Sequence, residues 1–223
     1  MKIEGASVLV TGANRGLGRA FAAELLNCGA ATVYAGARDP ATVTDSGVVP
    51  VALDVTDHAA LAALADRLPD VAMVINNAGV GAVGRPLTVD LDAVRAALEV
   101  NCIGLLAVSQ AFAPALAAHG GGALVNILSV YSWTTIPPIC GYAASKAAAW
   151  SMTDALRQQM RPHGTQVVGV HVGTIDTDMA AGVPGRKLAP AHVAREVLRA
   201  VVAGAEEVLV DEDTRRVKEG LSA

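Results

Sequence analysis

Short apolar runs rich in β-branched residues alternate with longer Ala- and Leu-rich stretches along most of the chain. The short runs have the length and composition of buried strands, and they lie at residues 7–10, 32–35, 48–53, 71–75, 123–128, 166–172 and 207–210. Stretches with helical spacing lie between most of them, at 17–28, 59–68, 89–118, 142–161 and 192–203. This alternation predicts the α/β fold class, a doubly wound parallel sheet of about seven strands with helices on both faces.

The edge of such a sheet where the strands end is the expected place for a ligand. Right-handed crossovers bring the carboxyl ends of parallel strands to one edge, and ligands bind outside that edge where the strand order reverses. We therefore expect the functional residues directly after the strands.

Length, charge and cysteine pattern narrow the classes of protein. A chain of 223 residues is in the range of one α/β domain, so a single domain over residues 1–223 is expected. The net charge is −4 without any basic cluster, which argues against a nucleic-acid partner. The first residues lack the order of a secretory signal and no apolar run approaches about 18 residues, so no membrane partner is expected. The cysteines, Cys28, Cys102 and Cys140, show no paired spacing, which fits reduced thiols in the cytoplasm.

A glycine-rich segment, TGANRGLG at 11–18, follows the first predicted strand and leads into an apolar helix. Such a turn lets the backbone approach a pyrophosphate and aims a helix N-terminus at it. Glycine spacing alone is a weak signal, and a turn that serves only packing is the alternative; the position after the first strand favours the dinucleotide. The expected cofactor-binding residues in this segment are Gly12, Asn14, Arg15, Gly16, Leu17 and Gly18.

The end of the second strand indicates which dinucleotide binds. A fold that holds NAD presents an acidic residue to the ribose 2′-hydroxyl there, but this strand ends in Gly-Ala-Arg38 with no earlier carboxylate. A guanidinium at Arg38 would bind a 2′-phosphate, and Arg15 could approach the same group. NADP(H) is therefore favoured over NAD(H), although either arginine alone would also fit a solvated surface charge.

Tyr142 and Lys146 are four residues apart on a predicted helix and so share one face. A tyrosine has a reference pKa of about 10, and bringing it to about 7 needs about 4 kcal/mol of phenolate stabilisation. A nearby ammonium and a cationic nicotinamide could supply that. Ser129, at the end of a predicted strand, can donate a hydrogen bond to a substrate oxygen while Tyr142 transfers the proton.

With these motifs in order, the chain resembles a short-chain dehydrogenase/reductase over nearly its full length. The matches are TGANRGLG at 11–18, Asp54-Val55, NNAG at 76–79, Asn101, Ser129 and YAASK at 142–146. The resemblance implies a single NAD(P)-binding Rossmann domain in which Asp54 and Val55 contact adenine, while Asn77, Ala78 and Gly79 support the cofactor. It also implies that Tyr142 and Lys146 bind the cofactor, with Lys146 on the nicotinamide ribose. Asn101 would position a water and complete an Asn-Ser-Tyr-Lys catalytic tetrad.

The segment after the sixth strand departs from the family pattern. Where the family commonly has Pro-Gly, this chain has Val172-Gly173, so a looser backbone beside the nicotinamide is expected; Gly173, Ile175 and Thr177 still match as cofactor contacts. The segment after Met179 is short and the tail after Val210 is charged rather than a pocket-closing extension. A small lid is therefore expected, with an open site or one that depends on a neighbouring subunit.

The loops at this edge predict the substrate. Their side chains are mostly apolar, at Val80, Val130, Tyr131, Trp133, Ile136, Ile139 and Met179. They favour a small neutral carbonyl or alcohol, as in a carbonyl reductase, over a charged acid; Trp133 is alternatively a packed loop anchor.

Several alternatives remain open. The same chemistry would serve an imine or an enone, and a non-catalytic dinucleotide-sensing protein could use the same fold. The apolar helices at 101–118 and 142–161 predict a homodimer or homotetramer. The histidines lack metal-ligand spacing, so no metal is expected, and His171 either reaches the cofactor edge or is a structural histidine.

Overall fold

Seven parallel strands form one sheet in the order β3-β2-β1-β4-β5-β6-β7. The computed structural model describes residues 1–221, and all seven predicted strands are present in it. They are β1 (Ser7–Thr11), β2 (Thr32–Ala37), β3 (Val49–Ala52), β4 (Val71–Asn76), β5 (Ala123–Ile127), β6 (Gln166–His171) and β7 (Glu207–Leu209). The order reverses between β1 and β4, which places the expected ligand site above these two strands.

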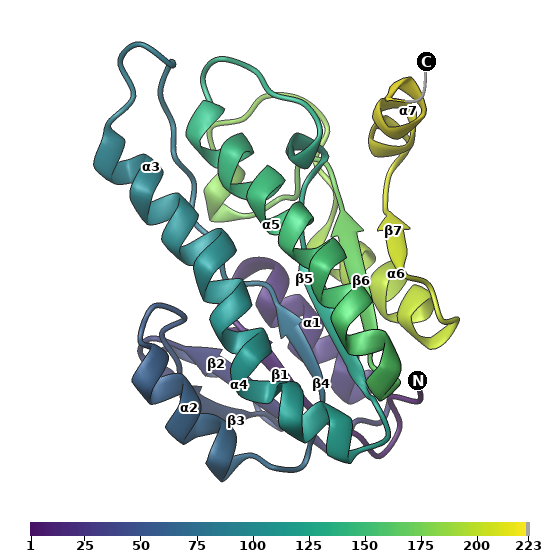
Figure 1. Ribbon diagram of the computed structural model, residues 1–223. Coiled ribbons are helices and arrows are strands. Elements are labelled where there is room, and N and C mark those ends of the chain that lie inside the picture. The colour runs from purple at the N-terminus through teal and green to yellow at the C-terminus, as the bar shows by residue number, and fades with distance from the viewer. Residues whose placement is uncertain (222–223) are drawn as a thin grey trace.

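Helices cover both faces of the sheet, which confirms the doubly wound fold (Figure 1). On one face α1 (Gly16–Asn27) and α6 (Pro190–Val202) bury Phe21 and Val197 against the strands. On the other face lie α2 (His58–Arg67), α4 (Leu105–Ala118) and α5 (Cys140–Met160), where Phe112 and Leu156 are buried. The central strands have side chains buried on both faces, as in β4, because helices pack on each side.

The predicted helix at 89–118 is divided in three. After α3 (Leu91–Leu98) the chain forms a π-helical segment at Glu99–Gly104 before α4 begins. A π turn contains one residue more than the α-helical pattern, and such turns are frequent at functional sites. The apolar periodicity gave no sign of this irregularity.

Helix 91–118 is also the one helix within residues 1–221 that is long and apolar enough, by length and composition alone, to cross a membrane. This contradicts the expectation that no apolar run is that long. Its most apolar window has a mean hydropathy of 1.6 and is 44% buried inside the protein. Val108, Phe112 and Leu116 are fully buried in the core between helix and sheet. A core helix passes the same test of length and composition, so this finding alone does not indicate a membrane partner.

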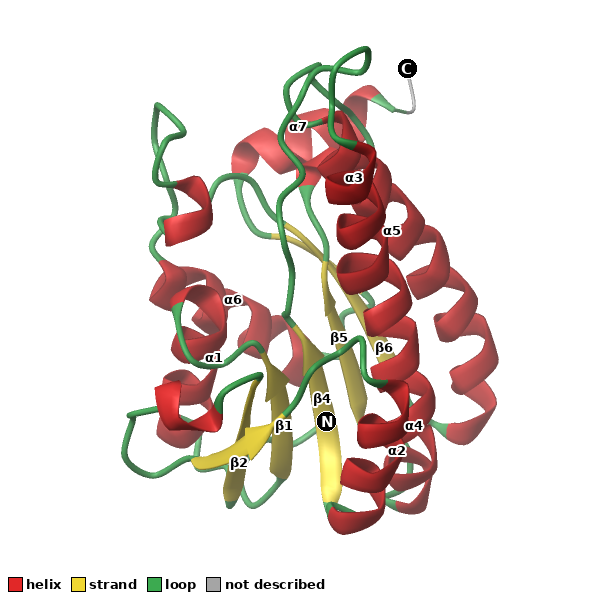
Figure 2. Cartoon of the chain, turned by 90° about the vertical axis from the view of Figure 1, so that its left-hand side faces the viewer, coloured by secondary structure: helices red, strands yellow, loops and turns green. Residues whose placement is uncertain are grey.

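The charged tail after Val210 forms a further helix, α7 (Glu212–Gly220), that the sequence pattern did not predict. Asp211 caps it by accepting hydrogen bonds from the backbone N–H and the hydroxyl of Thr214 at 2.9 and 2.8 Å. Figure 2 shows α7 at the end of the molecule where the long loops lie. The tail is therefore part of the same edge as the candidate site.

Candidate active site

The glycine-rich segment between β1 and α1 is shaped for close backbone approach. Gly12 and Gly16 have φ of +66° and +53°, a region that side chains rarely adopt. A Cβ at Gly18 would lie 2.1 Å from the Gly12 carbonyl oxygen, so only glycine fits there. The first turn of α1 has neither a side-chain cap nor an acidic residue. Its N–H groups and positive dipole end therefore fit a pyrophosphate.

A polar brace ties this loop to the end of β4. The Asn77 side-chain amide donates to the carbonyl oxygens of Thr11 and Gly12 at 2.9 and 3.2 Å. The Thr11 hydroxyl accepts from the backbone N–H groups of Asn77 and Ala78 at 3.0 and 2.9 Å. Asn77, Ala78 and Gly79 were predicted at this position, whereas Thr11, the first residue of the glycine motif, was not.

Of the two candidate 2′-phosphate residues, Arg15 has a partner within the protein and Arg38 is exposed. Arg15 forms an ion pair with Asp178 at 2.8 Å, between two exposed side chains. A Cβ at Gly16 would lie 3.1 Å from Thr177 Cγ2, so the glycine loop lies beside the segment after β6. Asn14 donates to Thr42 Oγ1 at 3.1 Å. Arg38 is exposed just beyond the end of β2, as predicted.

The residues expected at the adenine, Asp54 and Val55, follow β3. Asp54 accepts from the N–H and hydroxyl of Thr56 at 2.9 and 2.7 Å. These bonds lower the pKa of Asp54, and Arg38 adds to that effect. Val55 is buried, and a Cβ at Gly104 would lie 2.6 Å from its side chain. The Val55 side chain therefore packs on the π segment. Of the two residues expected at the adenine, Asp54 is the half-buried polar one.

Tyr142, Lys146 and Ser129 meet at the carboxyl end of β5. Burial raises the pKa of Tyr142, while a side-chain hydrogen bond with Ser129 acts in the opposite direction. Lys146 is buried, and its Nζ donates to the Ile127 carbonyl oxygen at 2.7 Å and lies 5.9 Å from the centroid of the Tyr142 ring. Burial lowers the pKa of Lys146 to about 8.

Asn101 lies in the π segment and is 1% exposed. Its Oδ1 accepts from the Val80 N–H, and its Nδ2 donates to the Val80 carbonyl and to Ser145 Oγ, each at 2.9 Å. Ser145 Oγ in turn donates to the Tyr142 carbonyl oxygen at 2.7 Å. Asn101 thus joins the chain after β4 to α5 through Ser145, a connecting residue that was not predicted.

All four predicted catalytic side chains therefore lie together. A Cβ placed on Gly79 would be 3.2 Å from Asn101 Oδ1 and 3.9 Å from Lys146 Nζ, so both groups lie beside this glycine. The missing side chain at this position leaves room beside the Lys146 ammonium.

The segment after β6 is hydrogen-bonded to the start of α7 and to the chain before α6. The Gly173 N–H donates to Asp211 Oδ2 at 2.8 Å, so this residue has a partner in the C-terminal tail, while the looser backbone expected from the missing proline stays a prediction. Ile175 forms an isolated bridge with Leu188, and the N–H of Asp176 donates to the Leu188 carbonyl at 2.9 Å. These contacts thus hold together the two ends of the short lid at residues 177–187.

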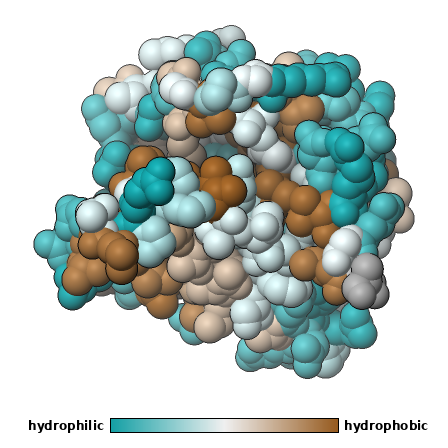
Figure 3. All heavy atoms as spheres, turned by 90° about the horizontal axis from the view of Figure 1, so that it is seen from above, coloured by the Kyte–Doolittle hydropathy of each residue, from teal (hydrophilic) through white to brown (hydrophobic). Residues whose placement is uncertain are grey.

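The predicted pocket residues differ in exposure. Ile136 and Met179 are 47% and 57% exposed at the rim, and Figure 3, which views the molecule from above, shows apolar patches separated by polar side chains. Trp133 stacks on His171 with 3.8 Å between the ring centroids, which favours its interpretation as a loop anchor. The remaining predicted lining residues, Val80, Val130, Tyr131 and Ile139, are half-buried.

His171 is a structural histidine rather than an exposed group at the cofactor edge. It is 1% exposed, and its Nδ1 lies 3.2 Å from the Ser129 carbonyl oxygen. Burial lowers its pKa to about 4, so the ring is neutral near pH 7. No cluster of three or more His, Cys, Asp or Glu side chains suited to a metal occurs within residues 1–221.

Comparison with known proteins places this geometry in a family. The model of the short chain dehydrogenase family matches residues 6–187. A crystal structure of a short chain dehydrogenase from Burkholderia cenocepacia J2315 in complex with NADP is 40% identical, covers 100% of this chain and 95% of that one, and superposes with a TM-score of 0.96. The 1-deoxy-11-beta-hydroxypentalenate dehydrogenase of Streptomyces exfoliatus is 35% identical over 198 residues, 82% of this chain and 72% of that protein.

"Probable oxidoreductase EphD" of Mycobacterium tuberculosis H37Rv is 34% identical over 190 residues, 78% of this chain. The match covers 32% of that protein, so this chain spans about a third of its length. The family match, the fold and the site agree: the chain belongs to the short-chain dehydrogenase family.

Proposed function

We propose that this chain is an NADP(H)-dependent oxidoreductase that acts on a small neutral carbonyl or alcohol, with Tyr142 as acid and base. The observation that carries the proposal is the meeting of Tyr142, Lys146, Ser129 and Asn101 at the carboxyl end of β5, beside the glycine loop. A protein that only sensed the dinucleotide would not need this combination.

A nicotinamide cofactor held by the glycine loop and Lys146 would supply the hydride for reduction of a carbonyl carbon. Tyr142 donates its hydroxyl proton to the carbonyl oxygen, and Ser129 Oγ donates a hydrogen bond to the same oxygen. The Lys146 ammonium stabilises the resulting phenolate until it regains a proton. Oxidation of an alcohol reverses each proton movement.

The surroundings of Tyr142 explain why its partners matter. Burial alone raises the pKa of Tyr142, which disfavours the phenolate that the alcohol-oxidising direction requires. Positive charge close to the hydroxyl opposes this effect. Lys146, whose stem is buried along α5, is the cation that the chain itself places nearest to the ring.

Two arginines support the preference for NADP(H). Arg38 follows β2 without a preceding carboxylate, and Arg15 belongs to the glycine loop. Either guanidinium can form charge-assisted bonds with a 2′-phosphate. The binding of that phosphate by Arg15 would compete with its exposed ion pair to Asp178. The NADP bound to the similar Burkholderia cenocepacia protein is consistent with this choice.

The test measures oxidation of NADPH and of NADH against a panel of neutral ketones, aldehydes and imines, with Tyr142→Phe and Tyr34→Phe alongside. Tyr34 hydrogen-bonds Asp70 at 3.1 Å, outside the catalytic group, and so serves as the matched control. We expect the wild-type protein to turn over with NADPH. Tyr142→Phe should turn over about a thousandfold more slowly and still bind the cofactor. Turnover that persists in Tyr142→Phe would refute its role. Activity on charged ketones alone would refute the substrate class, and turnover confined to imines would favour the alternative acceptor.

We further propose that copies of this chain associate through the outer faces of α4 and α5. Met152 of α5 is 36% exposed. Sedimentation at micromolar concentration should give a dimer or tetramer. A monomer under those conditions would contradict the proposal.

A further inference from the structure

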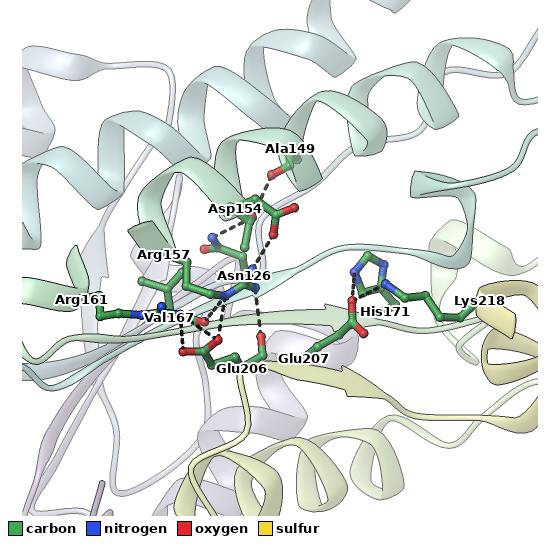
Figure 4. Close-up of polar contacts among 11 residues, drawn as sticks. Asn126, Ala149, Asp154, Arg157, Arg161, Val167, His171, Glu206, Glu207 and Lys218 are labelled. Carbon is green, nitrogen blue, oxygen red and sulfur yellow. Dashed lines mark hydrogen bonds and ion pairs between the residues drawn. The ribbon is translucent and has the colours of Figure 1, made fainter. Parts of the chain in front are cut away.

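Both tryptophans of the chain lie in one cluster beside the Ser129 turn. This tryptophan cluster consists of Trp133, Trp150, His171, Glu207 and Lys218. Trp133 stacks on His171, and its ring centroid is 6.1 Å from that of Trp150 in a T-shaped arrangement. Lys218 Nζ lies 4.6 Å from the centroid of the Trp133 ring and donates to Glu207 Oε1 at 2.8 Å. Figure 4 shows His171, Glu207 and Lys218 converging on one another.

The cluster contacts the Ser129 turn, residues 129–133, at two points. His171 Nδ1 bonds the Ser129 carbonyl oxygen at 3.2 Å, and because a carbonyl only accepts, Nδ1 carries the hydrogen. Trp133 ends the turn and its backbone N–H donates to the Val130 carbonyl at 3.2 Å. The buried Trp133 Nε1 has no hydrogen-bond partner within residues 1–221. The indole is therefore held by ring stacking and by Lys218.

Helix α7 is joined to this region at both ends. At its start, Asp211 accepts from the Gly173 N–H at 2.8 Å, two residues after His171. In its last turn, Lys218 reaches Glu207 of β7 and the Trp133 ring. Helix α7, which was not predicted, thus contacts the residues that hold the Ser129 turn in place.

Lys218 also balances the charge in the cluster. Glu207 Oε1 lies 3.9 Å from His171 Nε2, where a carboxylate alone would favour a protonated ring. Lys218 offsets that carboxylate and so favours the neutral imidazole that bonds Ser129. Lys218 and Glu207 are each about a third exposed, so their ion pair adds little to the free energy of folding. Its main effect is to hold the Lys218 ammonium in place.

We propose that Lys218 is a positioning residue that acts through Trp133 and His171 to fix the Ser129 turn, so that α7 sets where the Ser129 hydroxyl lies. The inference rests on the role proposed above for Ser129. None of the contacts that carry it belongs to the glycine loop or to Tyr142.

The experiment measures amide hydrogen exchange over the Ser129 turn in the full chain. The N–H groups of Val130, Ser132 and Trp133 are bonded to backbone carbonyls at 3.0 to 3.2 Å, so their exchange reports opening of the turn. Lys218→Met removes the ammonium and keeps the apolar stem, and Lys218→Arg keeps the charge. Arg216→Met removes a charge from an exposed position on the same helix and is the matched control.

We expect Lys218→Met to speed exchange over residues 130–133 by about tenfold, with Lys218→Arg and Arg216→Met within about twofold of wild type. If Lys218→Met unravels α7, Glu207→Gln tests the same link from β7 and should also speed exchange. Rates over 130–133 that match the Arg216→Met control in both variants would overturn the proposal.

Kinetics and fluorescence supply a second readout. With a ketone that wild type reduces, Lys218→Met should lower kcat about tenfold without changing the KM for NADPH, and Lys218→Arg should restore it. Tryptophan emission should shift in Lys218→Met alone, because both indoles lie near the ammonium. Exchange does not depend on chemistry, so failure of this inference is distinct from failure of the proposed function, which Tyr142→Phe reports.

Discussion

Acid should weaken the fold through one buried histidine. His171 is 1% exposed and burial lowers its pKa from 6.5 to about 4. The Ser129 carbonyl and the carboxylates of Glu207 and Asp154 favour the charged ring, whereas Lys218 disfavours it. Burial outweighs the groups that favour charge, so the folded protein holds this ring neutral until the pH is far below the range where a free imidazole titrates.

The magnitude follows from linkage. In the unfolded chain the ring binds a proton as the pH falls below about 6.5, whereas in the folded chain it does so only near 4. The neutral His171 ring therefore makes its full contribution to the free energy of unfolding above about pH 6.5, and this contribution is lost as the pH falls from 6.5 to 4. The whole shift corresponds to about 3 kcal/mol, of which about 2 kcal/mol is lost between about pH 7 and 5.

Urea unfolding at pH 7 and 5 measures this loss. His171→Asn retains an N–H for the Ser129 carbonyl and removes the titrating ring, so its free energy of unfolding should fall by about 2 kcal/mol less than that of wild type over this interval. His163→Asn, at an exposed histidine, should keep the wild-type dependence. If His171→Asn loses as much stability as wild type between the two pH values, the imidazole is not held neutral by the fold.

Three further substitutions test the cofactor site and its frame. Gly18→Ala places a Cβ 2.1 Å from the Gly12 carbonyl oxygen, so NADPH binding should weaken by at least about tenfold in a fluorescence titration, whereas Gly220→Ala, with open space, should not change it. Asn101→Ala leaves buried backbone groups unpaired and should lower the free energy of unfolding by about 2 kcal/mol in urea; an unchanged value would contradict the link that Asn101 forms between Val80 and Ser145. Arg38→Gln should raise the Kd for NADPH about tenfold and leave that for NADH unchanged; equal effects on both would refute 2′-phosphate recognition.

The strands and the catalytic residues were predictable because their signals are local. A buried parallel strand such as β4 is a short run of apolar residues bounded by polar ones, and the sequence places it within one residue of its true end. Tyr142 and Lys146 share a face because of helical spacing alone. The glycine motif is likewise a local signal, because Gly12 and Gly18 permit a close approach of the backbone that other residues would block.

Features that depend on long-range contacts were not predictable. Within α7 Thr214 is the one buried residue, so no apolar stripe marks the helix, and its position depends on Asp211 meeting Gly173, 38 residues away. The ion pair between Arg15 and Asp178 joins residues 163 apart. Lys146 was expected beside Tyr142, but no local pattern indicates that its ammonium bonds the Ile127 carbonyl.

The π segment at Glu99–Gly104 has a consequence for the length of the chain. Each residue of an α-helix turns about 100° around the axis and each residue of a π turn rotates less, so the wider turn takes up one additional residue while α3 and α4 keep the phase of a continuous helix. Deleting one residue there should restore an α-helical repeat and leave Ala97 and Leu105 facing the interior. It would, however, remove the wide turn from which Asn101 reaches Val80 and Ser145. A one-residue deletion in this segment should therefore disturb the position of Asn101 rather than the packing of α3 and α4.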